Sequence, residues 1–269
     1  LALERLRGLY TADDLDQFRV IMVHGGGASQ RLPNHSAGGK VLAPLPCQLG
    51  NGELCSMLEI TLILYAEVAA LVSPGSTLMT CADDLVFFAT TGLDFTQPGF
   101  TAFGIRNSVA VGERHGVFVL EPSDALLMGE PNTAVAARYL EKPPRSLMLE
   151  VGAVLESDQV NGEQVFTDSD FLFDRQTALK LLSVLDQHKE LVCSHEVDAY
   201  GDFLHPLGAA ADGAYIDVDS PSEGLKTVRL ALQAALSQVP LNVCVLTPGV
   251  FVHIGTMPEY LLHLTKGLE

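Results

Sequence analysis

The chain carries few positive charges for its size. Its 269 residues include 16 lysines and arginines against 33 aspartates and glutamates, so the formal net charge is −17 at pH 7. Nucleic acids and anionic membrane surfaces are bound through basic patches, and this composition argues against both partners. A small anionic substrate would also meet a repelling field. We therefore expect a divalent cation to screen such a substrate locally.

Cysteines in a metal-binding or redox spacing are also missing. None of the five cysteines belongs to a C-x-x-C motif. An odd, scattered set in apolar surroundings is typical of reduced thiols, and it predicts a cytoplasmic protein. Residues 1–7 contain two arginines and no cleavage site, so no signal peptide is indicated. The cysteines are Cys47, Cys55, Cys81, Cys193 and Cys244.

Long uninterrupted apolar runs are absent as well. The longest apolar stretch, residues 54–72, is broken by Glu59 and Glu67, which predicts a buried helix rather than a membrane span. Hydrophobic residues nevertheless make up 48% of the chain, enough for a full core. We expect one α/β domain over residues 19–269, preceded by a helical extension over residues 1–18.

The most informative stretch is HGGGASQRLPNHSAGGK, residues 24–40, which follows a short apolar run that predicts a strand. Its glycines expose backbone N–H groups, and Arg31 and Lys40 add two cations, a combination that suits a polyphosphate. No other lysine or arginine lies between Arg19 and Arg106. A glycine-rich turn with two solvated cations is the alternative interpretation.

Two common phosphate-binding loops are excluded at this stretch. Gln30 stands at the third glycine position of G-x-G-x-x-G, so a dinucleotide-binding loop is not indicated. The P-loop pattern G-x-x-x-x-G-K-[ST] does not occur either. What remains resembles the strand–GGxGxRL–Lys signature of sugar-phosphate nucleotidyltransferases, with Ser29 in place of one glycine.

Acidic residues follow the next predicted strand. We expect a helix over residues 53–72 and a strand over residues 77–80, which runs out at Asp83 and Asp84. A right-handed strand–helix–strand unit would place the glycine-rich loop and Asp83 at the same carboxyl edge of a sheet. Acids at that edge suit a hard cation such as Mg²⁺. A helix cap or a solvated turn is the alternative.

A second group of acids lies in HEVDAYGDF, residues 195–203. A cation that holds two phosphates takes oxygen ligands from two chain segments, and we predict Asp83 and Asp198 as these ligands. A surface loop with repelling charges is the alternative. Lys142 belongs to the one cation cluster in the middle of the chain, residues 141–145, and could hold a second phosphate, unless this is an ordinary exposed turn.

The remaining pattern predicts alternating strands and helices, and we expect a mixed, mostly parallel central sheet. Residues 132–140 fit a helix or a strand, and residues 212–219 fit the edge of a hairpin. Strands are expected at 100–103, 115–120, 168–173, 241–246 and 250–254, and further helices after Asp174, at 222–238 and at 258–266.

Six ordered blocks carry a resemblance to a known family. They are HGGGASQRLPNHSAGGK, TCADDLVFF, PGFTAFG, HGVFVL, EVDAYGDFLHPLG and VFVHIGTMPEYL. Together, over about residues 19–265, they resemble the fucose-1-phosphate guanylyltransferases, which also occur as the pyrophosphorylase half of bifunctional fucokinases. The resemblance implies a Rossmann-related, glycosyltransferase-A-like nucleotidyltransferase fold. It also implies a possible fused or separate sugar kinase and a C-terminal β-helix domain outside this chain.

The resemblance implies a reaction between GTP and L-fucose 1-phosphate that gives GDP-L-fucose and pyrophosphate, assisted by Mg²⁺. Asp198 matches the second metal acid most nearly, with Asp202 close enough to compete. The residues expected to be catalytic are Arg31, Lys40 and Asp83, those expected to bind substrate are Gly25, Gly26, Gly27, Ala28, Ser29, Lys142, Asp168 and Asp202, and those expected to bind metal are Asp83 and Asp198.

Other functions fit the same residues. A different sugar, such as D-arabinose 1-phosphate, could be the acceptor. A glycosyltransferase of the same fold would need a D-x-D motif, which Asp168-Ser169-Asp170 formally provides. A non-catalytic nucleotide-sugar sensor would bind without turnover, although Arg31, Lys40 and Asp83 argue against it.

Overall fold

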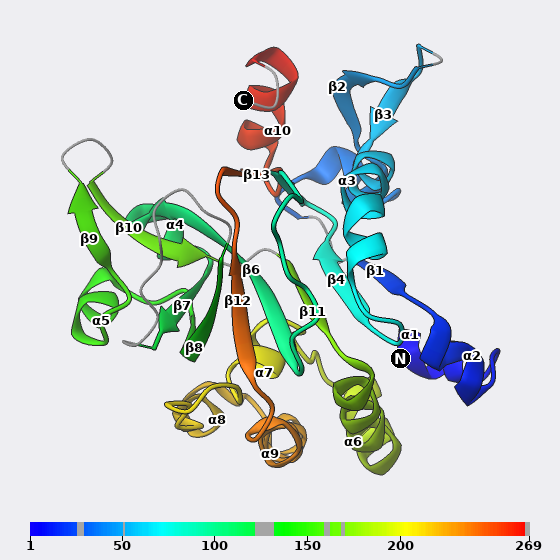
Figure 1. Cartoon of the computed structure of the whole chain (residues 1–269), viewed down its shortest axis with the longest axis vertical. Helices are drawn as coiled ribbons and strands as arrows, with labels where there is room; N and C mark the ends of the chain where they lie inside the picture. The colour runs from blue at the N-terminus through cyan, green and yellow to red at the C-terminus, as the bar shows by residue number, and fades with distance from the viewer. Residues whose placement is uncertain (26–29, 51, 122–131, 159–161, 168–169, 267–269) are drawn as a thin grey trace.

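The computed structural model describes residues 1–25, 30–50, 52–121, 132–158, 162–167 and 170–266 (Figure 1). Within these residues a nine-stranded sheet runs through the centre, in the order β1-β4-β11-β6-β12-β8-β7-β10-β9. Its strands are β1 Val20–His24, β4 Thr77–Cys81, β6 Phe100–Ser108, β7 Gly116–Leu120, β8 Asn132–Glu141, β9 Leu155–Asp158, β10 Gly162–Thr167, β11 Asp170–Phe173 and β12 Leu241–Val245.

Two smaller sheets accompany the central one. Strand β5 (Asp84–Phe88) pairs with β13 (Gly249–His253), and β2 (Pro44–Gln48) pairs with β3 (Leu54–Ser56). The α-helices are α1 Ala2–Arg7, α2 Ala12–Gln17, α3 Met57–Leu71, α4 Val109–Gly112, α5 Arg145–Glu150, α6 Arg175–Ser194, α7 Gly201–Leu204, α8 Ala214–Asp219, α9 Glu223–Leu236 and α10 Met257–Lys266.

The central sheet is mixed, but the expectation of a mostly parallel sheet is wrong. Only the β1–β4 and β6–β12 pairings are parallel among the described strands, and the others are antiparallel. Continuous apolar runs usually indicate parallel strands because helices cover both faces of such sheets. Here helices also cover both faces of antiparallel strands. The apolar pattern of the sequence therefore does not reveal the direction of the strands.

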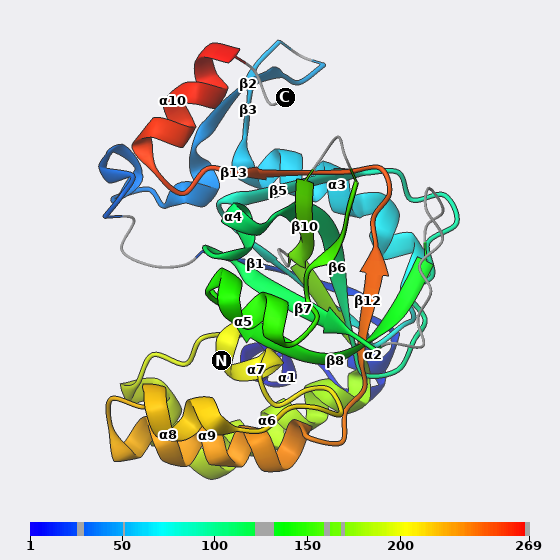
Figure 2. The same ribbon diagram turned by 90° about the vertical axis from the view of Figure 1, so that its left-hand side faces the viewer.

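Helices cover the two faces of the central sheet (Figure 2). On β11, Phe171 and Phe173 pack into a core shared with α6 and α9, whereas Leu172 points into a second core with α3. This alternation is the period of two that a strand imposes. Helices α3 on one face and α6 and α9 on the other therefore sandwich the sheet.

The predicted strand–helix–strand unit is confirmed as β1–α3–β4. The two strands are parallel, with His24 opposite Cys81, and the Ala82 N–H donates to the His24 carbonyl over 3.1 Å. Helix α3 begins at Met57 rather than at 53, because residues 54–56 pair with β2 and Ser56 caps the helix. The unit brings the start of the glycine-rich loop and Asp83 to the same edge.

Other expectations are met in part. Residues 132–140 form strand β8, and 168–173 contain β11, although 168 and 169 lie outside the described residues. Residues 212–219 are not a hairpin edge, because α8 begins after Gly213, whose φ of +68° turns the chain into the helix. Strands β9 and β10 were not expected from the sequence.

The N-terminal helices lie against α6. Ion pairs join Arg7 to Asp186, Lys189 to Glu4 and Arg175 to Asp16, with N–O distances of 2.6–2.7 Å. These pairs fix α1 and α2 to the body of the chain. No helix within the described ranges is long and apolar enough to cross a membrane.

Strand β11 begins with a buried acid. The Asp170 side chain has no solvent exposure and accepts a hydrogen bond from the Tyr65 hydroxyl. Burial raises the pKa of this carboxyl well above its usual value, outweighing a hydrogen bond from the Cys81 N–H. The folded chain therefore holds a proton at pH values where the unfolded chain has lost it.

This proton makes stability depend on pH. Asp170 stabilises the fold below the unfolded pKa of about 4, and the contribution is lost as the pH rises through the raised folded pKa. We expect Asp170→Asn, which keeps the shape and is always neutral, to become progressively more stable relative to the wild type as the pH rises from about 4 toward the raised folded pKa. Urea unfolding at each pH measures this difference, and parallel stability curves would contradict it.

Candidate active site

A cavity of about 890 Å³ opens where β1 and β4 end. Its walls come from both halves of the central sheet, because residues after β1 and β4 face residues before β7 and after β8. The first wall includes His24, Arg31, Lys40 and Asp83, and the second includes Arg114, His115, Glu141 and Lys142. Asp198, His253 and Glu259 complete the polar lining.

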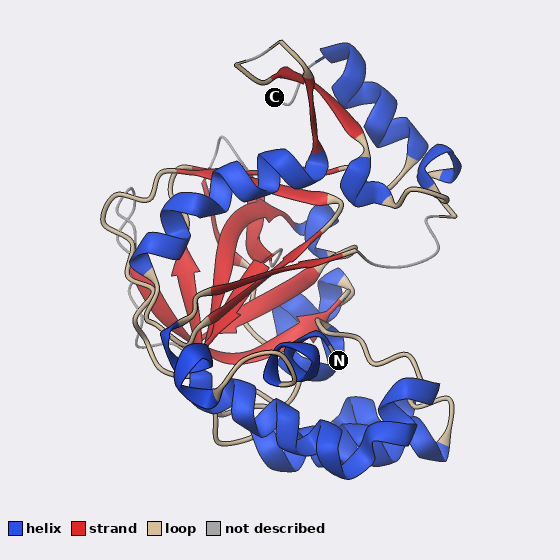
Figure 3. Cartoon of the chain, turned by 90° about the vertical axis from the view of Figure 1, so that its right-hand side faces the viewer, coloured by secondary structure: helices blue, strands red, loops and turns tan. Residues whose placement is uncertain are grey.

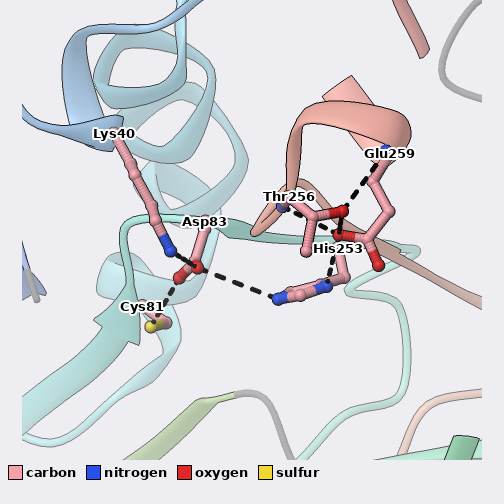
Figure 4. Close-up of polar contacts among 6 residues, drawn as sticks. All are labelled: Lys40, Cys81, Asp83, His253, Thr256 and Glu259. Carbon is pink, nitrogen blue, oxygen red and sulfur yellow. Dashed lines mark hydrogen bonds and ion pairs between the residues drawn. The ribbon is translucent and has the colours of Figure 1, made fainter. Parts of the chain in front are cut away.

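The two strongest predictions from the sequence meet in an ion pair. The Lys40 ammonium lies 2.5 Å from Asp83 Oδ2, and the two side chains are only 13% and 14% exposed (Figure 4). The Cys81 thiol donates to Asp83 Oδ1 over 3.1 Å. Burial raises the pKa of Asp83, but the hydrogen bonds from Lys40 and Cys81 outweigh it and lower the pKa overall. Asp83 is therefore a carboxylate at neutral pH.

The thiol beside Asp83 stays protonated. Burial raises the pKa of Cys81 well above its ordinary value, and the neighbouring carboxylates of Asp84 and Asp83 raise it further. A protonated thiol is a hydrogen-bond donor and a poor nucleophile. Cys81 therefore helps to hold Asp83 and is not a nucleophile in the cavity.

A histidine that the sequence did not single out faces the ion pair. His253 Nε2 lies 3.8 Å from Asp83 Oδ2, and its Nδ1 lies 3.1 Å from Glu259 Oε2. The pairing of β13 with β5 brings His253 opposite Asp84, two segments far apart in sequence. His253 and Glu259 belong to the VFVHIGTMPEYL block, and that resemblance was their only signal in the sequence.

His115 closes the same region. Its ring packs edge-on against Phe251 and His253, at centroid distances of 5.1 and 5.2 Å. Burial, together with the neighbouring His253 and Lys142, lowers the pKa of His115 to about 4. At neutral pH the ring carries no charge, so His115 shapes the cavity without attracting phosphate.

Lys142 enters the cavity on a strained backbone. It is the one non-glycine residue with positive φ in the described part of the chain, at +45°. Its N–H donates to the His115 carbonyl over 3.1 Å, and its ammonium pairs with Glu141. Such strain is costly and is concentrated at functional sites, which supports a role for Lys142 in binding.

The second acidic segment divides into two roles. Asp198 is exposed, lines the cavity and accepts a hydrogen bond from the Tyr200 N–H over 2.9 Å. Asp202 is 1% exposed, accepts from the Asp198 N–H over 2.9 Å and pairs with Arg229 over 2.7 Å. The cavity lining does not include Asp202, whose carboxylate pairs with Arg229, and its predicted roles in binding substrate or metal stay predictions. Asp202 fixes the segment that carries Asp198.

Burial also perturbs Asp202. It raises the pKa of this carboxyl above its usual value, although the Asp198 N–H and the Arg229 guanidinium act in the opposite direction. The ion pair with Arg229 therefore offsets the free-energy cost of burying the Asp202 carboxylate and adds little net stability.

The glycine-rich loop is described only at its ends. Gly25 is exposed after β1, and Arg31 lies on the cavity wall, where its carbonyl accepts from the Met257 N–H over 2.9 Å. Gly26, Gly27, Ala28 and Ser29 lie outside the described residues, as does Asp168. Their predicted contacts with substrate stay predictions.

The comparisons with known proteins decide the family. A family model described as "Fucose pyrophosphorylase domain" matches residues 12–269. The chain belongs to the fucose pyrophosphorylase family. The resemblance inferred from the six sequence blocks is thereby confirmed.

The similarity to individual proteins agrees with this family assignment. The chain is 38% identical to a fucose-1-phosphate guanylyltransferase of Mus musculus and 36% identical to that of Homo sapiens, over 98% of its own length. It spans about half of these relatives, 48% and 46% of their lengths. An L-fucokinase/L-fucose-1-P guanylyltransferase of Bacteroides fragilis is 24% identical over 54% of this chain and 16% of that protein.

The side chains that line the cavity limit how this fucose pyrophosphorylase domain could bind a metal ion. No cluster of three or more histidine, cysteine, aspartate or glutamate side chains could hold an ion within the described residues. Asp83 and Asp198 do line the same cavity. Mg²⁺ commonly takes one or two protein carboxylates and fills its other positions with water and substrate phosphates. The cavity lining therefore contains carboxylates of the kind that Mg²⁺ takes.

Removing Arg229 tests how Asp198 is held. Arg229→Met leaves the buried Asp202 carboxylate without its cation, and we expect the chain to lose about 3–5 kcal/mol of folding free energy. The double variant with Asp202→Asn should recover much of that loss because the stranded charge is gone. Denaturant unfolding measures both changes, and a single variant as stable as the wild type would contradict this role.

Proposed function

We propose that the chain is a nucleotidyltransferase domain that makes GDP-L-fucose and pyrophosphate from GTP and L-fucose 1-phosphate. The observation that carries the proposal is that one cavity gathers Arg31, Lys40, Asp83, Lys142 and Asp198. In a chain with a net charge of −17, this grouping suits two phosphorylated substrates and a cation better than it suits a solvated surface. Family membership and the names of the mouse and human relatives support the same reaction.

The proposal includes the finer fold assignment. We infer a Rossmann-related, glycosyltransferase-A-like nucleotidyltransferase fold, in which the β1–α3–β4 unit carries the phosphate loop on one strand and Asp83 on the next. Ligands bind at the carboxyl ends of parallel strands in such folds. The cavity lies at that edge of β1 and β4.

The reaction is a displacement at the α-phosphorus of GTP. A sugar phosphate oxygen forms the new bond to this phosphorus, and the bond to the oxygen that bridges the α- and β-phosphates breaks. Pyrophosphate takes the electron pair. The second pKa of the sugar phosphate is about 6, by analogy with phosphoserine, so the attacking group is already ionised and needs no general base. Catalysis then consists of alignment and charge neutralisation.

Three cationic side chains that line the cavity are assigned to phosphate groups of the substrates. Arg31, on the wall formed by β1 and β4, is suited to hold the departing pyrophosphate. Lys40 is suited to bridge the α-phosphate and the sugar phosphate, and Lys142 approaches from the opposite wall as a ligand of the sugar phosphate. Each holds an anionic group that would otherwise repel its neighbour.

Asp83 and Asp198 would hold Mg²⁺ in this cavity. When bound, the ion would offset the negative charge of the two phosphate groups as they approach. Asp83 also pairs with Lys40, so a cation held by Asp83 would leave the lysine available to phosphate. The ion pair keeps Asp83 ionised and in place.

The structure and a substrate assay distinguish the alternative functions from the proposed one. A glycosyltransferase with Asp168-Ser169-Asp170 as its D-x-D motif is disfavoured, because Asp170 is fully buried against Tyr65 and the cavity lining does not include it. Other acceptors such as D-arabinose 1-phosphate stay open. A matrix of nucleoside triphosphates and sugar 1-phosphates, scored by pyrophosphate release, identifies the base and the sugar. Binding without release in every combination would indicate a nucleotide-sugar sensor.

A sugar kinase is the natural supplier of the second substrate. The Bacteroides fragilis relative carries both activities in its name. We propose that L-fucose 1-phosphate reaches this domain from a fused or separate kinase, and that a β-helix domain can accompany it outside this chain. Both are proposals about the whole protein.

Replacing Lys40 tests the chemistry directly. We expect Lys40→Ala to lower kcat for pyrophosphate release on the order of 100-fold, which corresponds to ~3 kcal/mol, because one cation is lost from the transition state. The affinity for GTP should change much less, since Arg31 and the loop backbone still bind the triphosphate. Steady-state kinetics and calorimetric GTP binding measure the two effects.

The control for this variant is Lys226→Ala. Lys226 pairs with the exposed Asp217 on α8 and does not line the cavity. Its loss should leave both kcat and GTP binding unchanged. An unchanged kcat in Lys40→Ala would remove Lys40 from the chemistry.

A further inference from the structure

The last of the six sequence blocks has no role in the proposed reaction. This block, residues 250–261, forms the end of β13, a turn and the first turns of α10. Figure 3 shows α10 beside the β2–β3 hairpin at one end of the molecule, at the opposite end from α6 and α9. Even so, His253, Thr256 and Glu259 from this block line the cavity.

The block is fixed to the backbone of Asp83. The Ile254 N–H donates to the Asp83 carbonyl over 2.7 Å, next to the antiparallel pairing of β13 with β5. This hydrogen bond sets the preceding residue, His253, beside the Asp83 carboxylate. The histidine ring then lies between two acids, with one ring nitrogen facing Asp83 and the other facing Glu259 (Figure 4).

Glu259 is held more firmly than a surface carboxylate. The backbone N–H and the hydroxyl of Thr256 donate to Glu259 Oε2 over 2.9 and 2.7 Å, which forms a capping box at the start of α10. The same Oε2 atom lies 3.1 Å from His253 Nδ1. The carboxylate that stabilises the helix end therefore also fixes the histidine ring.

Helix α10 is itself tied to the other substrate-facing segments. The Met257 N–H donates to the Arg31 carbonyl over 2.9 Å. The Tyr260 hydroxyl donates to the Pro44 carbonyl over 2.8 Å, just after the turn that carries Lys40. Glu259 therefore projects from an element whose place is set by the same segments that present Arg31 and Lys40.

A phosphate that binds Lys40 would compete with Asp83 for the charge of the ammonium group. Lys40 and His253 both face Asp83 Oδ2, and Cys81 holds the other oxygen. When Lys40 turns toward the phosphates, Cys81 and His253 are the described side chains left to fix the carboxylate. Of these two, only His253 is braced by a second carboxylate.

We propose that Glu259 is a positioning residue that acts through His253 to hold the Asp83 carboxylate in its reactive orientation. This inference rests on the proposed function. Partners of this kind, which orient a ligand or its neighbour without touching substrate, change activity by about 10- to 100-fold when they are replaced.

Glu259→Gln tests the proposal because glutamine keeps the capping box but loses the charge that faces His253. We expect kcat for pyrophosphate release to fall about 10-fold or more, the Mg²⁺ concentration for half-maximal rate to rise, and the melting temperature to stay unchanged. The matched control is Glu59→Gln, the same replacement at the same place in the α3 capping box, where Ser56 is the partner. That control should leave kcat unchanged. An unchanged kcat in Glu259→Gln would overturn the proposal.

A double-mutant cycle shows whether the effect passes through the histidine. In a His253→Gln background, we expect Glu259→Gln to cause no further loss of kcat, because the link to Asp83 is already broken. A second, additive loss would overturn the proposal, since Glu259 would then act on another group.

A spectroscopic measurement keeps this proposal separate from the proposed reaction. The ¹³C chemical shift of the Asp83 carboxylate, assigned by its loss in Asp83→Asn, should change in Glu259→Gln and not in Glu59→Gln. An unchanged shift in both variants would overturn the positioning role even if the enzyme is active. A shift change in Glu259→Gln, combined with a wild-type chain that releases no pyrophosphate, would support the positioning role and contradict the proposed function alone.

Discussion

The ion pair between Lys40 and Asp83 is the contact on which the rest of the site depends. It joins the end of the glycine-rich segment to the end of strand β4, two places 43 residues apart in sequence. Both side chains are largely buried, so neither charge is tolerable without the other. The pair keeps the Asp83 carboxylate ionised and holds the Lys40 ammonium at the edge of the sheet where β1 and β4 end. The histidine, thiol and glutamate around it restrict how that carboxylate can move.

The sheet brings together cavity walls from its two halves, as the proposed binding of two anions requires. The β1–α3–β4 unit supplies Arg31, Lys40 and Asp83, and the strands β7 and β8 supply His115 and Lys142. The chain is strongly acidic and has few lysines and arginines. Those that line the cavity come from segments that are far apart in sequence and meet only in the folded chain. Helix α10 and the segment with Asp198 then close the gaps between the walls.

Much of this arrangement was predictable from local sequence. Glycines, acids and a capping signal around Met57 mark the strand–helix–strand unit, and they placed the loop and Asp83 together. Strand direction was not predictable, because antiparallel strands buried on both faces show the same apolar runs as parallel ones. Asp198 and Asp202 could not be told apart either, since the difference comes from Arg229, 27 residues further along. His253 escaped notice because only the pairing of β13 with β5 brings it to Asp83.

The most direct test follows the phosphorus atoms of GTP. The chain is incubated with L-fucose 1-phosphate, Mg²⁺ and GTP labelled with ³²P at either the α- or the γ-position, and the products are separated. The account predicts that the α-label appears in a nucleotide sugar and the γ-label in pyrophosphate, at rates that match. Transfer of the γ-label to the sugar, or bound GTP that keeps its label in both preparations, would contradict nucleotidyl transfer at this cavity.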